Sequence, residues 1–208
     1  VSGEWRSPEM LLALVRVPAL INCEDAEVLT SGRNRNVKID LVCKRQTLTV
    51  VVKAFRKPSL LKNAIDRRGR GSKARRTWLA AVHLAEAGVG TPEPVAFLER
   101  WVEERLVESY VVTVFQEETT SFTQELNHLF RREPECAKLM ELMHTVAAAV
   151  RAMHDSGFQH NDLGNQNVLL RRQGEAVWGD VQFIDLNRGR IRDSLTPPQR
   201  ARDISRLY

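Results

Sequence analysis

Cysteine is scarce in this sequence, with three residues in all. Cys23, Cys43 and Cys136 are scattered along the chain and include no CxxC pair. A zinc site or a disulfide framework is therefore not expected, and a reducing cytosol fits this cysteine usage. Repeats and low-complexity tracts are also missing, while hydrophobic and charged residues make up 43% and 27% of the chain. These ordinary fractions predict a soluble globular protein rather than a disordered one.

Long apolar runs are missing as well. The most apolar early stretch, residues 10–21, is interrupted by Arg16 and Pro18 and is too short to cross a bilayer. Its start has neither a basic leader nor a small-residue cleavage site. We therefore expect no secretion signal, no transmembrane helix and a cytoplasmic location. Peripheral contact with the inner face of a bacterial inner membrane stays open.

Positive charge exceeds negative charge, with a net charge of +5 and a pI of about 9.4. This balance favours anionic partners, namely a nucleotide, a nucleic acid or an anionic membrane surface. Residues 56–76 are strongly basic, and Asp66 is their only acidic residue. Aromatic stacking platforms are not interleaved with this run, so nucleic acid is not the partner we expect. Two interpretations of this run stay open: it contacts anionic lipid headgroups, or it is a solvated charged loop.

The first half of the chain reads as β-rich. Residues 26–29, 37–42 and 47–55 predict a three-stranded antiparallel meander. Ser72 is placed to cap a helix that runs to about Ala87. Two further strands are expected at 95–98 and 109–115.

The second half carries helical periodicity instead. Residues 122–130 and 139–153 predict helices, 168–170 and 181–184 predict a small hairpin, and a last helix begins near Arg200. The expected fold class is α+β, with an N-terminal extension (1–25), a β-rich lobe with one helix (26–116) and a helical lobe (117–208). The sequence starts at Val1 and stops inside the last expected helix, so we expect a fragment whose helical lobe is incomplete.

The segment from His160 to Asn167 carries the clearest chemical pattern. Its sequence, HNDLGNQN, fits the kinase catalytic loop, in which Asp and Asn stand five positions apart. An expected helix precedes it and an expected strand follows it. Asp162 would accept the proton of an acceptor hydroxyl, and Asn167 would offer an oxygen to magnesium. A plain polar turn between helix and strand is the alternative.

Asp185 ends the next apolar strand, one expected hairpin after Asn167. A second magnesium-binding carboxylate belongs at this place in a kinase-like fold. An aspartate that merely terminates a strand is common. The sequence separation between Asp162 and Asp185 fits one hairpin. The two residues together therefore favour a magnesium site over an aspartate that only ends a strand.

Candidate phosphate-binding residues lie in the β-rich half. Lys53 ends an apolar strand, where a lysine would hold the phosphates of ATP, although a lysine facing solvent at a strand edge is an alternative. The turn 30–34 offers Ser31, Gly32 and Asn34 to cover those phosphates, or is a simple hairpin turn. Asp203 could support the catalytic loop from the last helix, or contribute helix N-terminal charge.

Three segments together resemble the lipopolysaccharide kinase (Kdo/WaaP) family: HNDLGNQNVLL, FIDLNRGRIR and RARDISRLY. The segment SKARRTWLAAVHLAEAGVGTPEPVAF is similar to the helix and turn of that family. The resemblance implies a two-lobed protein-kinase-like fold and transfer of the ATP γ-phosphate to heptose or Kdo of the lipopolysaccharide inner core. It implies Asp162 as the catalytic aspartate, Asn167 and Asp185 as magnesium ligands and Lys53 as the phosphate-binding lysine.

The sequence departs from this pattern in two places. Thr77 stands where the helix would supply a glutamate to pair with Lys53, and Asn161 replaces the arginine of protein kinases. The short segment after Asp185 has no Ala-Pro-Glu signature, which favours a sugar acceptor over a peptide. Arg188, Arg190 and Arg192 would suit an anionic glycolipid or sugar. A RIO-like protein kinase, a small-molecule phosphotransferase and a pseudokinase that acts as a binding module remain alternatives.

Overall fold

A computed structural model describes residues 1–24, 26–30, 34–43, 46–59, 69, 71–131, 136–172 and 178–207. The chain forms two compact units, one of Val1–Val82 with Glu93–Phe115 and one of His83–Pro92 with Gln116–Tyr208. The first is built on an antiparallel sheet and the second contains helices and two small sheets. The expected α+β class is therefore confirmed.

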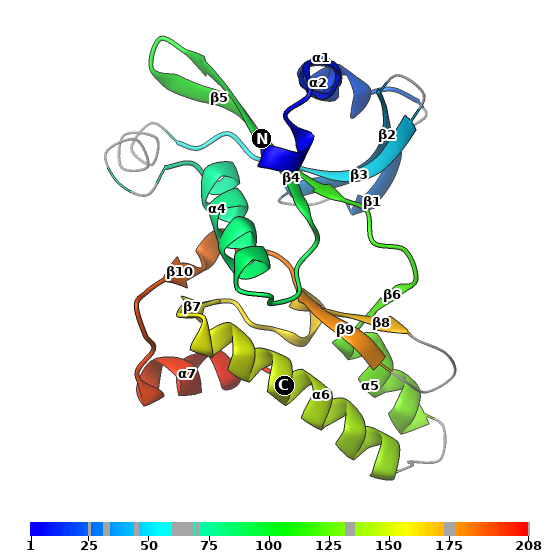
Figure 1. Ribbon diagram of the computed structural model, residues 1–208, viewed down its shortest axis with the longest axis vertical. Helices are drawn as coiled ribbons and strands as arrows, with labels where there is room; N and C mark the ends of the chain where they lie inside the picture. The colour runs from blue at the N-terminus through cyan, green and yellow to red at the C-terminus, as the bar shows by residue number, and fades with distance from the viewer. Residues whose placement is uncertain are drawn as a thin grey trace. The chain divides into compact units, whose positions relative to one another are not determined.

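A five-stranded antiparallel sheet forms the centre of the first unit (Figure 1). The strand order is β1-β2-β3-β5-β4. The predicted meander is confirmed, because its three strands pair in sequence order. Residues on one side of the second strand, Val37, Ile39 and Leu41, are buried, as their period of two requires. The strands are β1 (Glu27–Thr30), β2 (Asn34–Cys43), β3 (Gln46–Phe55), β4 (Pro94–Val102) and β5 (Arg105–Val114).

β4 and β5 extend further than expected and form a long hairpin. The predicted strands 95–98 and 109–115 are too short, since pairing continues to Val102 and Arg105. Glu103 and Glu104 turn the chain with φ values of 45° and 62°. Positive φ at two central residues is typical of a type I′ hairpin turn, where Asn and Gly are favoured. Two glutamates give no such signal, so the sequence did not reveal the turn.

Two short helices near the N-terminus pack on this sheet. α1 (Pro8–Val15) and α2 (Val17–Leu20) bury Met10, Leu14 and Val17 in one apolar cluster with the sheet. Ser7 caps the first helix, because its Oγ accepts a hydrogen bond from the Met10 N–H at 3.1 Å. The segment 1–25, expected as an extension, thus contributes to the core of the first unit.

α4 (Lys73–Glu86) begins where the sequence predicts. Ser72 is its N-cap, with its Oγ accepting from the Arg75 N–H at 3.0 Å. Ala74 at the start of the helix is buried with Phe55 of β3. Thr77 is buried too, and its hydroxyl donates to the Lys73 carbonyl at 2.8 Å.

The second unit contains the helices and the hairpin around residues 160–167, the candidate catalytic loop. α6 packs along β7 and β9 (Figure 1), and the predicted hairpin is confirmed as β8 paired with β9. The last helix starts at Pro197 rather than Arg200, because Thr196 and Gln199 form a capping box around its first turn. The elements are η1 (Gly3–Trp5) in the first unit and, in the second, β6 (Thr119–Ser121), α5 (Phe122–Arg131), α6 (Cys136–Asp155), β7 (Phe158–Gln159), η2 (Asn165–Asn167), β8 (Val168–Arg172), β9 (Trp178–Phe183), η3 (Leu186–Arg188), β10 (Arg190–Ile191) and α7 (Pro197–Ile204).

Candidate active site

The chain enters the catalytic loop through a tight turn at Gly157. This glycine has φ of +80°, and a Cβ there would lie 2.0 Å from the Arg192 carbonyl oxygen. Its own carbonyl accepts from the Arg192 N–H at 3.0 Å. A side chain cannot fit at such an approach, so glycine sets the path from α6 into β7. β10 pairs with β7 directly beside this turn.

Asp203 of α7 holds the start of the loop. Its carboxylate is fully buried and accepts from the backbone N–H groups of His160, at 2.7 Å, and Asn161, at 2.8 Å. The ring Nε2 of His154, on α6, lies 3.3 Å from the same carboxylate. The expectation that Asp203 supports the loop is confirmed, and His154 is buried beside the same carboxylate. A buried carboxylate with several donors is held firmly in place.

Asn161 sits in the left-handed region, with φ of 62°. Asparagine tolerates this conformation better than most residues with a side chain. Its amide donates to the carbonyls of Gln159, at 3.2 Å, and Arg188, at 3.4 Å. The asparagine that stands in place of the protein-kinase arginine therefore ties the loop to β7 and to the end of η3.

His160 joins the catalytic loop to the strand that leads to Asp185. Its Nε2 lies 3.0 Å from the Ile184 carbonyl oxygen, and because a carbonyl only accepts, we assign the ring proton to Nε2. Burial lowers the pKa of His160 below the usual 6.5, and the hydrogen bond to Ile184 and the nearby carboxylates only partly oppose this effect. The ring is therefore neutral at physiological pH.

We expect His160 to make the protein less stable in mild acid. Its pKa is lowered by folding, so as pH falls below about 6.5 the unfolded chain takes up a proton that the folded chain does not. The contribution of neutral His160 to the free energy of unfolding is complete above the pKa that this ring has in the unfolded chain. It is lost as the pH falls toward the pKa of the ring in the folded chain, with a slope of up to about 1.4 kcal/mol per pH unit. Urea unfolding at several pH values should show that, below pH about 6.5, the free energy of unfolding depends less steeply on pH in His160→Gln than in the native protein. Equal slopes in the two proteins would contradict this prediction.

The β8–β9 hairpin brings the two candidate metal ligands together. Val168 pairs with Phe183, and the Ile184 N–H donates to the Asn167 carbonyl at 3.0 Å. Asn167 and Asp185 thus flank adjacent ends of two paired strands. Asp185 has φ of 61° and ψ of 43°, a conformation that costs free energy in a residue other than glycine and is concentrated at functional sites.

The donor atoms at this hairpin end suit magnesium. The Asn167 Nδ2 donates to the Asp162 carbonyl at 2.8 Å, which commits the nitrogen and leaves the amide oxygen as the ligand atom. The Asp185 carboxylate accepts from the Asn187 amide, which orients it. Magnesium prefers oxygen ligands and keeps several waters or phosphate oxygens, so two protein ligands suffice. Among the described residues, groups of three or more His, Cys, Asp or Glu that could hold a metal are not found.

Asp162, the candidate base, is reached by two arginines. Its Oδ1 lies 3.1 Å from Arg188 Nη1 and 3.3 Å from Arg206 Nη1. The side chains are 31%, 53% and 44% exposed, respectively, so each pair adds little stability. Arg188 was expected near the acceptor. Arg206 was missed, because nothing in the local sequence indicates a contact with a residue 44 positions earlier.

The candidate phosphate-binding residues belong to the first unit. Lys53 lies in β3 opposite Asn36 of β2, and its Nζ is 5.7 Å from the centre of the Phe55 ring. Asn34 begins β2 and pairs with Phe55. Ser31 and Gly32 lie outside the described residues, as do Arg67, Arg68 and Arg70 of the basic segment. The second unit, by contrast, contains Asp162, Asn167 and Asp185 together, as the motif spacing predicts.

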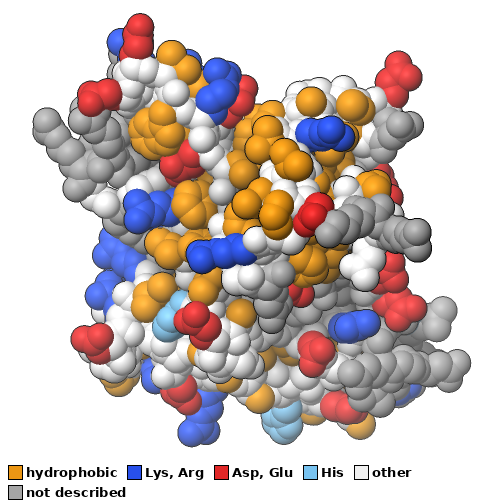
Figure 2. Space-filling model, turned by 45° about the horizontal axis from the view of Figure 1, so that its top comes forward, with side chains coloured by type: hydrophobic (Ala, Val, Ile, Leu, Met, Phe, Trp, Pro, Cys, Tyr) orange, Lys and Arg blue, Asp and Glu red, His pale blue; other side chains and the backbone are white. Residues whose placement is uncertain are grey.

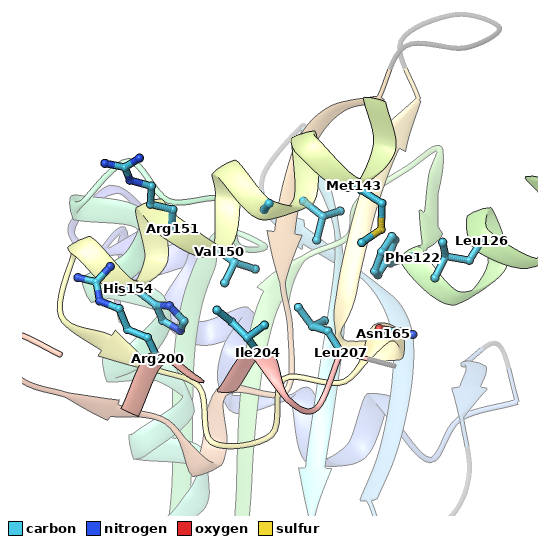
Figure 3. A pocket seen from close by; sticks show the side chains of 12 residues that line it. Phe122, Leu126, Met143, Val150, Arg151, His154, Asn165, Arg200, Ile204 and Leu207 are labelled. Carbon is cyan, nitrogen blue, oxygen red and sulfur yellow. The ribbon is translucent and has the colours of Figure 1, made fainter. Parts of the chain in front are cut away.

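A separate apolar pocket of about 430 Å³ lies between α5, α6 and the end of the chain. Figure 3 shows Arg151, His154 and Arg200 at one end of it and Phe122, Leu126 and Met143 at the other. Both arginines pair with Asp155, Arg200 at 2.6 Å and Arg151 at 3.6 Å. Asn165 of the candidate catalytic loop and His154 of α6 contribute to its wall, so the pocket lies beside the loop.

Comparisons with known proteins agree on one family. A curated relative from Pseudomonas aeruginosa, lipopolysaccharide core heptose(I) kinase WaaP, is 32% identical over 141 residues, which are 65% of this chain and 51% of the relative. The Escherichia coli protein of the same name is 28% identical over 151 residues, 72% of this chain and 57% of the relative. The chain therefore spans about half the length of the curated relatives it matches.

A solved structure, WaaP in complex with acyl carrier protein, matches with a TM-score of 0.68 and 25% identity. The match covers 97% of this chain and 78% of that one, and it confirms the expected protein-kinase-like fold. The family model for the lipopolysaccharide kinase (Kdo/WaaP) family matches residues 24–208. The resemblance of the three sequence segments is confirmed: the chain belongs to the lipopolysaccharide kinase (Kdo/WaaP) family.

Proposed function

We propose that this chain is the catalytic part of an ATP- and magnesium-dependent kinase that phosphorylates a sugar hydroxyl of the lipopolysaccharide inner core, heptose or Kdo, or of a similar glycolipid. One observation carries the proposal. Asn167 bonds to the backbone of Asp162 and is held beside Asp185 by the β8–β9 pairing. The candidate proton acceptor and the two candidate oxygen ligands thus belong to one loop and one hairpin of the second unit, which supports a role in phosphoryl transfer.

The residues have separate roles in this proposal. Asp162 accepts the proton of the acceptor hydroxyl. At the same time the hydroxyl oxygen attacks the γ-phosphorus, and ADP leaves. Asn167 and Asp185 hold magnesium, which neutralises charge on the phosphates when it is bound. Lys53 holds the ATP phosphates, and the turn with Ser31, Gly32 and Asn34 covers them. Asp203 and His160 keep the loop in position through the contacts described above.

A sugar acceptor is favoured over a peptide by the chain that follows Asp185. α7 begins at Pro197, twelve residues after Asp185, and η3 and the two-residue strand β10 take up part of this span. Such a short segment offers little surface for an extended peptide. The family and the names of its curated relatives support the lipopolysaccharide inner core as the acceptor.

We further propose that the protein works in the cytoplasm at the inner face of the inner membrane, where a glycolipid acceptor is accessible. None of the described helices is both long and apolar enough to span a membrane. Peripheral contact is supported by the net charge of +5 and by Leu12 and Val15 of α1, which are exposed. Figure 2 shows exposed hydrophobic side chains beside Lys and Arg on one face of the molecule.

The test is transfer of labelled γ-phosphate from ATP to a deacylated inner-core oligosaccharide, with and without magnesium. We expect magnesium-dependent turnover, at about 1–100 s⁻¹ for a kinase with all of its parts in place. An unstructured protein offered as acceptor should not be phosphorylated. Phosphorylation of the protein alone would support a RIO-like kinase, and nucleotide binding without any turnover would support a pseudokinase. Either result would contradict the proposed function.

A further inference from the structure

We propose that Arg188 and Arg206 form an anion-binding site beside Asp162 that holds a carboxylate group of the acceptor, and so selects an acidic sugar. The inference rests on the proposed function and names two residues that decide the acceptor. Neither arginine belongs to the catalytic loop. They come from η3 and from the turn after α7, two segments that meet only through the fold.

The geometry at Asp162 is the first argument. Both guanidinium groups reach the same atom, Oδ1, at 3.1 Å and 3.3 Å. A carboxylate oxygen has two lone pairs, and two N–H donors occupy them. Both guanidinium groups therefore lie directly beside the carboxylate that would take up the hydroxyl proton. An anionic group of the acceptor close to that hydroxyl would come within reach of both.

The exposure of the three side chains is the second argument. Arg188, Arg206 and Asp162 are all in contact with water, so the two ion pairs are weak and easily exchanged. Arginine matches carboxylate and phosphate oxygens with a planar set of donors, which makes a group with two or three oxygens a better partner than the single Oδ1 atom. Two positive groups against one carboxylate also leave a local excess of positive charge.

The neighbouring arginines show that the placement is specific. Arg190 pairs its backbone with Gln159 in β10, and the Arg192 N–H donates to the Gly157 carbonyl. Of the three arginines expected to meet the acceptor, Arg188 alone makes an ion pair with Asp162 among the described residues. The site therefore lies next to the attacking hydroxyl, and the anionic group belongs to the acceptor close to that hydroxyl.

The experiment compares two acceptors, the deacylated inner-core oligosaccharide and the same oligosaccharide with its carboxylates reduced to alcohols. The quantity measured is the ratio of kcat/KM for the two. In the native protein we expect the anionic acceptor to be preferred by about 10- to 100-fold, the range that charge-assisted hydrogen bonds give. In Arg188→Gln, Arg206→Gln and the double variant the ratio should fall toward one. Lysine at either position should restore part of the preference.

Arg202→Gln is the matched control, because it removes an exposed arginine from the same helix that precedes Arg206. It should keep the native ratio. An equal loss on both acceptors would overturn the proposal, since it would assign the arginines to the transferred phosphoryl group or to the fold. An unchanged ratio in the double variant would overturn it as well.

A binding measurement separates this proposal from the proposed function. Calorimetric titration of the anionic oligosaccharide into the protein with magnesium and ADP needs no turnover. Weaker binding of the reduced oligosaccharide, with the difference abolished in the double variant, would support the site even in a protein that transfers no phosphate. Equal affinity for both oligosaccharides in the native protein would overturn it, whatever the protein catalyses.

Discussion

Asp162→Asn is expected to lower kcat for phosphate transfer to the acceptor by about 10²- to 10⁴-fold, the range that a general base contributes. The amide keeps the size of the side chain and can still accept a hydrogen bond, but it cannot take up the hydroxyl proton. Stability should change by less than about 1 kcal/mol, because the two ion pairs of Asp162 are exposed. Steady-state kinetics together with urea unfolding separate these two effects.

Asp193→Asn is the control for this substitution, since it makes the same change at an exposed aspartate between β10 and α7. It should keep the native kcat. Full turnover by Asp162→Asn would remove Asp162 from the proposed role. A large loss of stability in the same variant would mean that the residue supports the fold rather than the reaction.

Asp203→Ala is expected to lower the free energy of unfolding by about 3–5 kcal/mol, because each buried donor left without an acceptor costs about 1–3 kcal/mol. The change leaves the N–H groups of His160 and Asn161 and the ring of His154 without the carboxylate to which they now bond. Activity should fall as well, because this carboxylate binds the backbone N–H groups of the two residues just before Asp162. Asp203→Asn keeps one acceptor oxygen and should lose less stability, about 1–3 kcal/mol.

The matched control is Asp180→Ala, at an exposed position on β9. Its effect should stay within about 0.5 kcal/mol, as for most surface substitutions. Urea denaturation of the three variants gives the comparison. A loss below about 1 kcal/mol for Asp203→Ala would contradict the supporting role assigned to this carboxylate.

Features that depend on neighbours in the sequence could be predicted from the sequence. The spacing of Asp162, Asn167 and Asp185 is set by one loop and one hairpin, and Ser72 caps its own helix. The supporting role of Asp203 was one of two interpretations of its place in the last predicted helix, and the buried carboxylate confirms it. The start of α7 was missed although its signal was present, in the capping box that begins at Thr196.

Features that depend on distant parts of the chain could not be predicted in the same way. α1 is short and would be marginal alone, and its burial depends on a sheet that the later sequence provides. The hairpin turn at Glu103 and Glu104 uses residues that do not favour positive φ. Arg206 reaches Asp162 across 44 positions. For α1 and Arg206 the decisive interaction is tertiary, and a local pattern carries no information about it.

The long reach of Asp203 also has a consequence for the order in which the protein is made. Asn161 and the carboxylate that fixes it are separated by 42 positions. At a synthesis rate of about 5–20 residues per second, the ribosome adds those residues in about 2–8 s. The catalytic loop and both candidate metal ligands are therefore translated before the residue that holds the loop in place. During that interval a nascent chain would contain the catalytic sequence without its native conformation.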